Sequence, residues 1–279
     1  MPETTPISTV HLIPDLDQLL MDLLRSLDQS DWELQTLAPE WKVKDIAAHL
    51  LDGNIRSLSV SKDRYQEGKA DEILGYQELV TVLNKLNKDW VKAMRRVSPS
   101  MLLTLLEMTN KMYSEHLAGL LPFEKAVFPV AWAGESQSLN WFHIAREYTE
   151  KWHHQQQIRN AVGGISPLFE QRFFKPYLDT SLWPLSFFLH GVKAEEGDTF
   201  IIEVSGPGGG EWYMRYSSDA WSKSETAPSY AVTKIRVDDQ VIWRIFSRQI
   251  SDDELKNRVF ITGKKEPAEA FLKMKAVMV

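Results

Sequence analysis

The segment EKWHHQQQIR (residues 150–159) contains a glutamate and a histidine whose spacing suits a metal ion. Glu150 and His154 are four residues apart, so on a helix they lie on the same side and about 6 Å apart along the axis. A carboxylate and an imidazole in this arrangement can supply two ligands to one divalent ion. A catalytic site normally takes a third ligand from the protein and leaves a further position open for water or substrate.

The residues around this pair do not supply the third ligand. His153 points about 100° away from His154 on a helical wheel, and Glu147 lies about 10.5 Å from His154 along the axis, which is too far for a shared ion. The third ligand is therefore expected from elsewhere in the fold. The candidates are the remaining histidines, between which spacing does not decide: His11, His49, His116, His143 and His190.

A simpler interpretation needs no metal ion. The apolar stripe of the predicted helix 141–162 is centred on Trp141, Tyr148 and Trp152, and the polar residues lie on a different face. Such a face is usually solvated. A histidine beside an apolar helix stripe, as His49 is, is usually a hydrogen-bonded core residue.

Composition limits the classes to which the chain can belong. Its 279 residues are 43 % hydrophobic and 11 % aromatic, which is enough for a buried core and long enough for two domains. A net charge of −6 argues against a nucleic-acid partner, because proteins that neutralise phosphates carry a basic surplus. The sequence has no apolar run long enough for a membrane span and no signal-peptide pattern. With no cysteine, it has no disulfide and no thiolate site, and the cytoplasm is the expected location.

The first 165 residues read as an all-α, up-and-down helical bundle. Apolar residues recur at helical spacing, and Ser98-Pro99 and Gly163-Gly164 are start and stop signals. The predicted helices cover residues 16–27, a segment from Trp41 past Leu50, 76–97, 99–117 and 141–162.

Residues 166–279 read as a small α+β domain, because short segments rich in β-branched and aromatic residues alternate with helical ones. Predicted strands are 200–204, 211–217, 229–237 and 258–263, and predicted helices are 180–190, 241–250 and 266–279. The chain is thus expected to be multi-domain, with its boundary near residue 165.

Two segments resemble a known family. APEWKVKDIAAHLLDGN (38–54) is similar to the first metal-ligand segment of mycothiol-dependent maleylpyruvate isomerases and their DinB-like relatives. REYTEKWHHQQQIRNAVG (146–163) resembles the Glu-x-Trp-x-His helix of that family. The segments IWRIFSRQI (242–250) and VFITGKKEPAEAFLKMK (259–275) look like its sterol-carrier-like C-terminal domain.

The resemblance implies a specific site. The metal ligands would be His49, Glu150 and His154, around zinc or alternatively nickel, and the cofactor would be a low-molecular-weight thiol such as mycothiol. Arg248, or Arg244 in its place, would bind the carboxylates of the substrate. Two departures from the family pattern are Gln157, where an aspartate is common, and Lys42, where a Ser or Thr cap is usual.

Three functions remain open at this point. The first is a thiol-dependent isomerase or transferase acting on a small acidic molecule, in which the metal lowers the pKa of the thiol. The second is a metal-dependent hydrolase with Glu147 as base. The third is a non-catalytic protein that binds a small ligand and carries a structural metal. The sequence does not indicate the oligomeric state.

Overall fold

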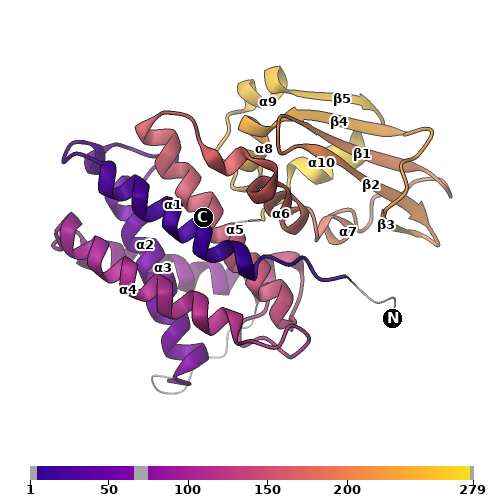
Figure 1. Cartoon of the computed structure of the whole chain (residues 1–279). Helices are drawn as coiled ribbons and strands as arrows, with labels where there is room; N and C mark the ends of the chain where they lie inside the picture. The colour runs from indigo at the N-terminus through magenta and orange to yellow at the C-terminus, as the bar shows by residue number, and fades with distance from the viewer. Residues whose placement is uncertain (1–4, 66–74, 277–279) are drawn as a thin grey trace. The chain divides into compact units, whose positions relative to one another are not determined.

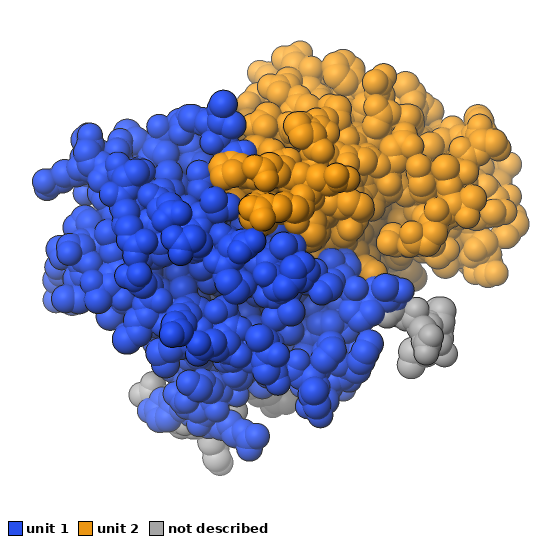
Figure 2. Space-filling model, viewed as in Figure 1, with its two compact units in different colours: residues 1–131, 135–166, 279 blue, residues 132–134, 167–278 orange. Residues whose placement is uncertain are grey.

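The structure is a computed structural model that describes residues 5–65 and 75–276 of the chain. The chain folds into two compact units, with residues 1–131, 135–166 and 279 in one and residues 132–134 and 167–278 in the other (Figure 2). The first unit is helical and the second contains a five-stranded sheet (Figure 1). The expected fold class, a helical bundle followed by an α+β unit, is confirmed.

Long helices build the first unit, and each follows the apolar spacing of its sequence. Helix α5 packs against α1 and α2, α4 packs against the same two, and α3 packs against α2. Their shared core includes Leu20 and Leu24 from α1, Ile46 and Leu51 from α2, and Leu106 from α4. In the described residues the helices are α1 (Ile13–Ser26), α2 (Val43–Ser57), α3 (Tyr76–Met94), α4 (Pro99–Ala118) and α5 (Asn140–Val162).

A buried ion pair ties α5 to its neighbours in this unit. Lys151 Nζ on α5 donates to Asp17 Oδ1 on α1 at 2.7 Å. The same ammonium group donates to Asn54 Oδ1 on α2 at 3.3 Å and to Asn110 Oδ1 on α4 at 3.2 Å. Lys151 and Asp17 are only 8 % and 9 % exposed, so both charges are held out of water. This network sets how α5 sits against α1, α2 and α4.

The sheet of the second unit has the strand order β3-β2-β1-β4-β5. Strands β1 and β4 are parallel, and the other neighbouring pairs are antiparallel. Ile202 lies opposite Ile235, and both point to the buried face of the sheet. The strands are β1 (Thr199–Ser205), β2 (Gly210–Ser217), β3 (Ala220–Ser224), β4 (Thr233–Asp238) and β5 (Val259–Gly263).

Helices cover the buried face of this sheet. Helices α8 and α10 both contact β4, and α8 also contacts β1. Phe246 of α8 and Phe271 of α10 are fully buried there. The helices of this unit are α6 (Gln171–Ser181), α7 (Leu185–Phe188), α8 (Asp239–Phe246), α9 (Asp252–Arg258) and α10 (Lys265–Leu272).

Several predicted boundaries in this unit are wrong. The expected helix 180–190 is wrong, because it overlaps only the last two residues of α6 and the short α7, and Pro184, which has no N–H to donate, precedes α7. Helix α10 ends at Leu272, and the N–H of Ala276 donates instead to the carbonyl of Phe246 at 3.1 Å. Residues 277–279 of the expected terminal helix lie outside the described residues.

Among the elements of this unit that were not predicted are most of α6, strand β3 and helix α9. Strand β3 is a short edge strand with mostly polar residues, so its alternation is weak. Helix α9 follows Ser251, whose Oγ accepts from the N–H of Glu254 while Glu254 Oε2 accepts from the N–H of Ser251, both at 3.3 Å. This capping box was a readable start signal in the sequence SDDE.

Candidate metal centre

Helix α2 presents His49 to the interior of the helical unit. Lys42 offers no side-chain cap at the start of this helix, but its N–H donates to Asp45 Oδ2 at 3.1 Å. Arg95 holds the same carboxylate with two hydrogen bonds of 3.0 and 3.1 Å. Asp45 thus stabilises the first turn in the usual position of an N3 carboxylate. His49 follows one turn later on the same side of the helix.

Helix α5 presents Glu150 and His154, and its polar face is not solvated. Most of its residues are buried, including His154, Gln155 and Gln157, although their types are polar. The interpretation of this face as an ordinary solvated surface is therefore wrong. Since α5 packs against α1 and α2, its polar side chains must find partners inside the protein.

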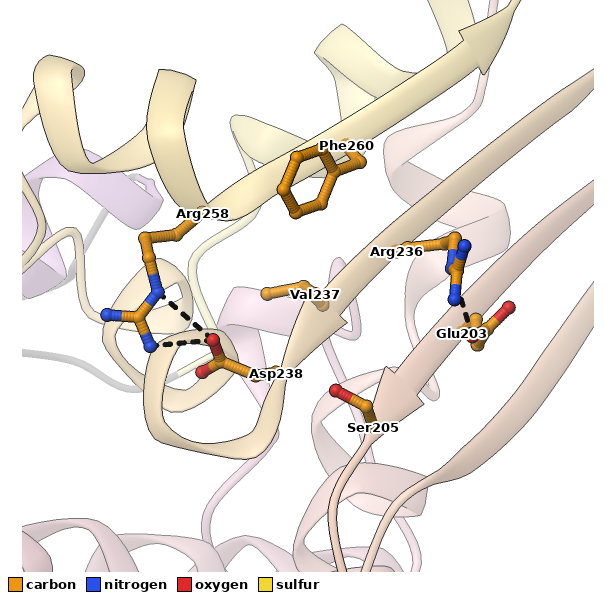
Figure 3. Close-up of a pocket in the computed structure, with 7 residues that line it drawn as sticks. All are labelled: Glu203, Ser205, Arg236, Val237, Asp238, Arg258 and Phe260. Carbon is orange, nitrogen blue, oxygen red and sulfur yellow. Dashed lines mark hydrogen bonds and ion pairs between the residues drawn. The ribbon is translucent and has the colours of Figure 1, made fainter.

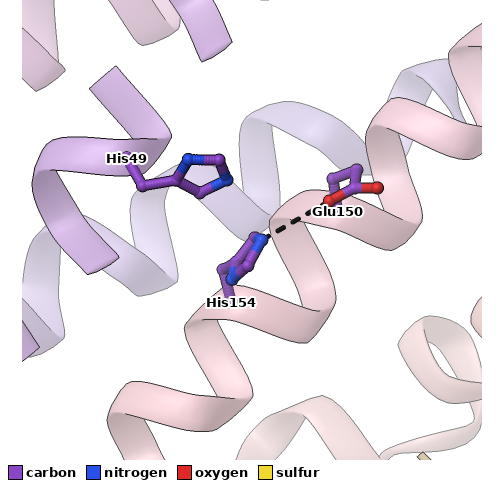
Figure 4. Close-up of side chains that lie close together, drawn as sticks. All are labelled: His49, Glu150 and His154. Atoms are coloured by element: carbon purple, nitrogen blue, oxygen red, sulfur yellow. Dashed lines mark ion pairs between the residues drawn. The ribbon is translucent and has the colours of Figure 1, made fainter. Parts of the chain in front are cut away.

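The fold brings three potential ligands from these two helices together. One ligand atom each from His49, Glu150 and His154 lies within 4.8 Å of the others. His49 projects from α2 toward Glu150 and His154, which project from one face of α5 (Figure 4). The imidazole rings of His49 and His154 have centroids 4.6 Å apart and meet edge to face.

The donor set suits a divalent cation, and one of its pairs has the spacing of two ligands on such an ion. His154 Nε2 is buried, lies 3.4 Å from Glu150 Oε2 and has no hydrogen-bond partner among the described residues. Two ligands about 2.1 Å from a tetrahedral ion are themselves about 3.4 Å apart. Burial, with smaller contributions from His154 and Arg56, holds the pKa of His49 well below its usual value, so this imidazole is neutral as a ligand must be. Two imidazoles and a carboxylate suit zinc or nickel.

Gln157 supports this site, although no motif in the sequence indicates that role. Its Oε1 lies 2.8 Å from His154 Nδ1, and both residues are fully buried. Because an amide oxygen can only accept, Nδ1 carries the proton and Nε2 is left with a free lone pair. Metal-binding histidines are commonly oriented through their second nitrogen in this way. The i, i+3 spacing of the two residues could have suggested the contact.

Replacing Gln157 with leucine is expected to weaken zinc binding about 10- to 100-fold, because leucine cannot hold the tautomer of His154. The measurement is competition for zinc against a chromophoric chelator. Gln156→Leu is the matched control, since Gln156 lies on the same helix and accepts from Ser166 Oγ at 2.6 Å. Equal losses of affinity in the two variants would contradict a specific role for Gln157.

Trp41 forms an aromatic wall of the same site. Its ring centroid lies 4.7 Å from that of His49 and 6.1 Å from that of His154. It lies just before α2 in the chain, so the start of that helix positions both the wall and the histidine.

The other histidines are not brought to Glu150 and His154, and each has a different setting in the structure. His116 Nε2 lies 2.8 Å from Ser61 Oγ, and His143 Nδ1 accepts from Arg146 Nη2 at 2.9 Å. His11 is exposed beside Ser8, and His190 lies in the second unit. Of the five candidates for a third ligand, His49 is the one that lies in a cluster with Glu150 and His154 in the described residues.

The two candidate arginines lie in the second unit and are bonded within it. Arg244 makes a bidentate pair with Glu254 at 2.8 and 3.0 Å and donates through Nε to the carbonyl of Gln249. Arg248 donates through Nη2 to the carbonyl of Lys273 at 2.8 Å. Its backbone has a φ of 55°, a left-handed conformation that is uncommon for a residue other than glycine. The guanidinium group of Arg248 therefore makes fewer of these hydrogen bonds than that of Arg244.

Glu147 is poorly suited to act as a base. It pairs with Arg146, and His143 Nδ1 lies 3.9 Å from its Oε1. Burial alone would raise the pKa of this carboxyl, but Arg146 and His143 outweigh burial and the pKa is lowered. A carboxylate held in this way accepts a proton less readily than an ordinary glutamate.

A cavity of about 330 Å³ on the sheet of the second unit offers different chemistry (Figure 3). Arg258 donates to Asp238 at 3.1 and 2.6 Å, and Arg236 donates to Glu203 at 3.1 Å. These charges neutralise one another, and no histidine is among the described residues that line the cavity. The cavity therefore lacks the ligand set that α2 and α5 provide.

The helices were compared with the length and apolarity that a membrane span requires. In residues 5–65 and 75–276, none is both long enough and apolar enough to span a bilayer.

Comparison with known proteins adds independent findings. The mycothiol maleylpyruvate isomerase N-terminal domain matches residues 13–159, which is more than half of the chain. Crystal structures of the mycothiol-dependent maleylpyruvate isomerase and of a histidine-to-alanine mutant of it are similar over 93 % of this chain and 96 % of theirs, each with a TM-score of 0.54. At 11 % and 12 % sequence identity, these structures show a shared fold. No curated protein matches the sequence.

Proposed function

This chain belongs to the family of the mycothiol maleylpyruvate isomerase N-terminal domain, and we propose that it is a divalent-metal-dependent enzyme that uses a low-molecular-weight thiol. Its substrate is a small acidic molecule, and its reaction is cis–trans isomerisation or transfer of the sulfur. The proposal assigns residues 1–165 as a DinB-like metal-binding domain and residues 166–279 as a sterol-carrier-like domain. It places the protein in the cytoplasm.

The convergence of His49, Glu150 and His154 carries this proposal. These residues would hold zinc, or nickel in its place. When bound, such an ion would lower the pKa of a coordinated thiol and supply a thiolate at neutral pH. The protein itself has no cysteine, so the sulfur would come from a cofactor such as mycothiol.

The surrounding residues have definite roles in this proposal. Gln157 keeps the proton of His154 on Nδ1, so that Nε2 faces Glu150 with its lone pair free. Trp41 lies against both imidazole rings and limits the rotation of His49. Arg248 would bind a carboxylate of the substrate through the guanidinium N–H groups that do not donate to the carbonyl of Lys273.

Metal-dependent hydrolysis is the alternative with the same ligands. It would use Glu147 as the base that activates water, and the arginine pair and lowered pKa of Glu147 argue against that role. A non-catalytic protein with a structural metal is the other alternative. Structural metal sites are usually closed by four protein ligands, whereas this cluster of described residues offers three.

The test is an activity assay with purified protein, in metal-free form and after reconstitution with zinc or nickel. Maleylpyruvate is supplied with mycothiol, with cysteine or with no thiol, and formation of the trans isomer is followed by absorbance. Turnover is expected only when metal and thiol are both present. Metal-dependent turnover of a hydrolysable substrate without thiol would favour the hydrolase. Failure of the protein to retain any stoichiometric metal would overturn both enzymatic proposals.

A further inference from the structure

Arg56 on α2 is a cation with a buried donor, Nη1, that has no hydrogen-bond partner among the described residues. Arg56 follows His49 by seven residues, which is two turns on the same side of the helix. Its Nη2 lies 3.5 Å from Asp52 Oδ2, and Asp52 is three residues after His49. The guanidinium group therefore reaches back one turn along α2 to Asp52.

Arg56 meets its carboxylate at 3.5 Å, as the exposed Arg172 meets Glu170, whereas several other arginines of this protein make short hydrogen bonds. Arg95, Arg244 and Arg258 each make two short hydrogen bonds to one carboxylate. Arg56, in contrast, makes a long contact with Asp52, and its Nη1 is buried without a hydrogen-bond partner among the described residues. Asp52 Oδ2 is likewise buried and has no hydrogen-bond partner among the described residues. Buried charged donors without partners are uncommon in proteins and commonly mark a place that an ion or a water fills.

Arg146, another arginine of this region, is bonded to its neighbours through Nη2, although its Nε is also buried without a hydrogen-bond partner among the described residues. Its Nη2 donates to His143 Nδ1 and forms a short contact with Glu147. It therefore serves the buried network of α5, whereas Arg56 keeps part of its side chain exposed, at 32 %.

We propose that Arg56 forms an anion subsite beside the metal centre, which takes a carboxylate group of the substrate. A planar guanidinium matches the two oxygens of a carboxylate. A bound divalent ion and Arg56 would repel each other, and an anion that contacts both relieves the repulsion. The inference rests on the proposed function and deepens it, because it names a residue of the helical unit, in addition to Arg248, that receives a carboxylate of the substrate.

The experiment measures binding of maleate to zinc-reconstituted protein by calorimetry, with neither thiol nor turnover. Replacing Arg56 with glutamine is expected to weaken maleate binding about 10- to 100-fold, since a charge-assisted hydrogen bond is lost. Arg56→Lys, which keeps the charge without the planar fork, should give an intermediate loss. Zinc affinity is measured on the same samples and is expected to stay within about twofold, because Arg56 is not a ligand.

Controls separate this effect from general ones. Arg25→Gln makes the same change in charge at an exposed ion pair with Glu107 and should leave maleate binding unchanged. The double variant Asp52→Asn/Arg56→Gln removes both charges, so that no carboxylate is left uncompensated, and should reproduce the loss in maleate binding. Unchanged maleate affinity in Arg56→Gln, or an equal loss in Arg25→Gln, would overturn the proposal.

A second arm distinguishes the source of the anion. The thiolate of 2-mercaptoethanol carries no carboxylate, and its binding to the zinc protein should not depend on Arg56. If Arg56→Gln weakens this thiol and spares maleate, the subsite belongs to the cofactor and the proposal is wrong. If the protein binds no zinc, the proposed function is wrong. Maleate binding to the metal-free protein and to its Arg56→Gln variant then tests the proposal about Arg56 by itself.

Discussion

Replacing His49 with alanine is expected to remove the bound metal ion and to lower kcat/KM of the thiol-dependent reaction by about 1,000-fold or more. The removed imidazole supplies the one ligand of the cluster that comes from α2, so Glu150 and His154 would be left as a pair on α5. A catalytic metal contributes several kcal/mol to transition-state stabilisation, and each 1.4 kcal/mol is about tenfold in rate. Metal content is measured by plasma mass spectrometry after dialysis, and activity by the assay with mycothiol.

His11→Ala is the matched control for this variant. His11 lies in the same unit, is exposed and is hydrogen-bonded to Ser8, so its loss should change neither metal content nor turnover. Circular dichroism verifies that both variants keep their helices. Retention of a full equivalent of metal by His49→Ala would contradict the proposed ligand set. Loss of the metal with unchanged turnover would indicate that the metal has no catalytic role.

The second large effect concerns the stability of the helical unit. Asp17→Ala is expected to lower the free energy of unfolding by about 3–5 kcal/mol, because it leaves the ammonium group of Lys151 buried without its charge partner. The pair is 2.7 Å apart and less than a tenth of either side chain is exposed. Burial raises the pKa of Asp17 even though Lys151 acts in the opposite direction, so the environment of this pair already disfavours charge. Urea unfolding followed by circular dichroism measures the change.

Asp22→Ala provides the comparison on the same helix. Asp22 is 59 % exposed and pairs loosely with Arg25 at 3.9 Å, so its loss should change stability by less than about 0.5 kcal/mol. The double variant Asp17→Leu/Lys151→Met removes both buried charges and is expected to recover most of the loss. If Asp17→Ala is as stable as the unsubstituted protein, the loss of Asp17 does not leave a costly unpaired charge on Lys151. The network then does not fix the position of α5.

Local patterns in the sequence determine much of the architecture. The 3.6-residue repeat of apolar side chains predicts the helices of the first unit, because a helix must bury one stripe against its neighbours. β-Branched and aromatic segments after residue 165 predict the sheet in the second unit. The helix breaks at Pro184 and after Leu272 are harder to predict, since they depend on contacts such as the bond from Ala276 to Phe246.

The candidate site divides in the same way. The sequence by itself determined that Glu150 and His154 are neighbours, because their spacing and the geometry of one helix suffice. Only the tertiary structure decided which histidine joins them, since His49 lies far away in the chain and spacing did not distinguish it from the other candidates. It also decided that the polar face of α5 is buried and that Arg56 lies against Asp52, three residues after His49. The regular geometry of an α-helix determines which residues are neighbours within it. Contacts between helices depend instead on how whole apolar faces pack together.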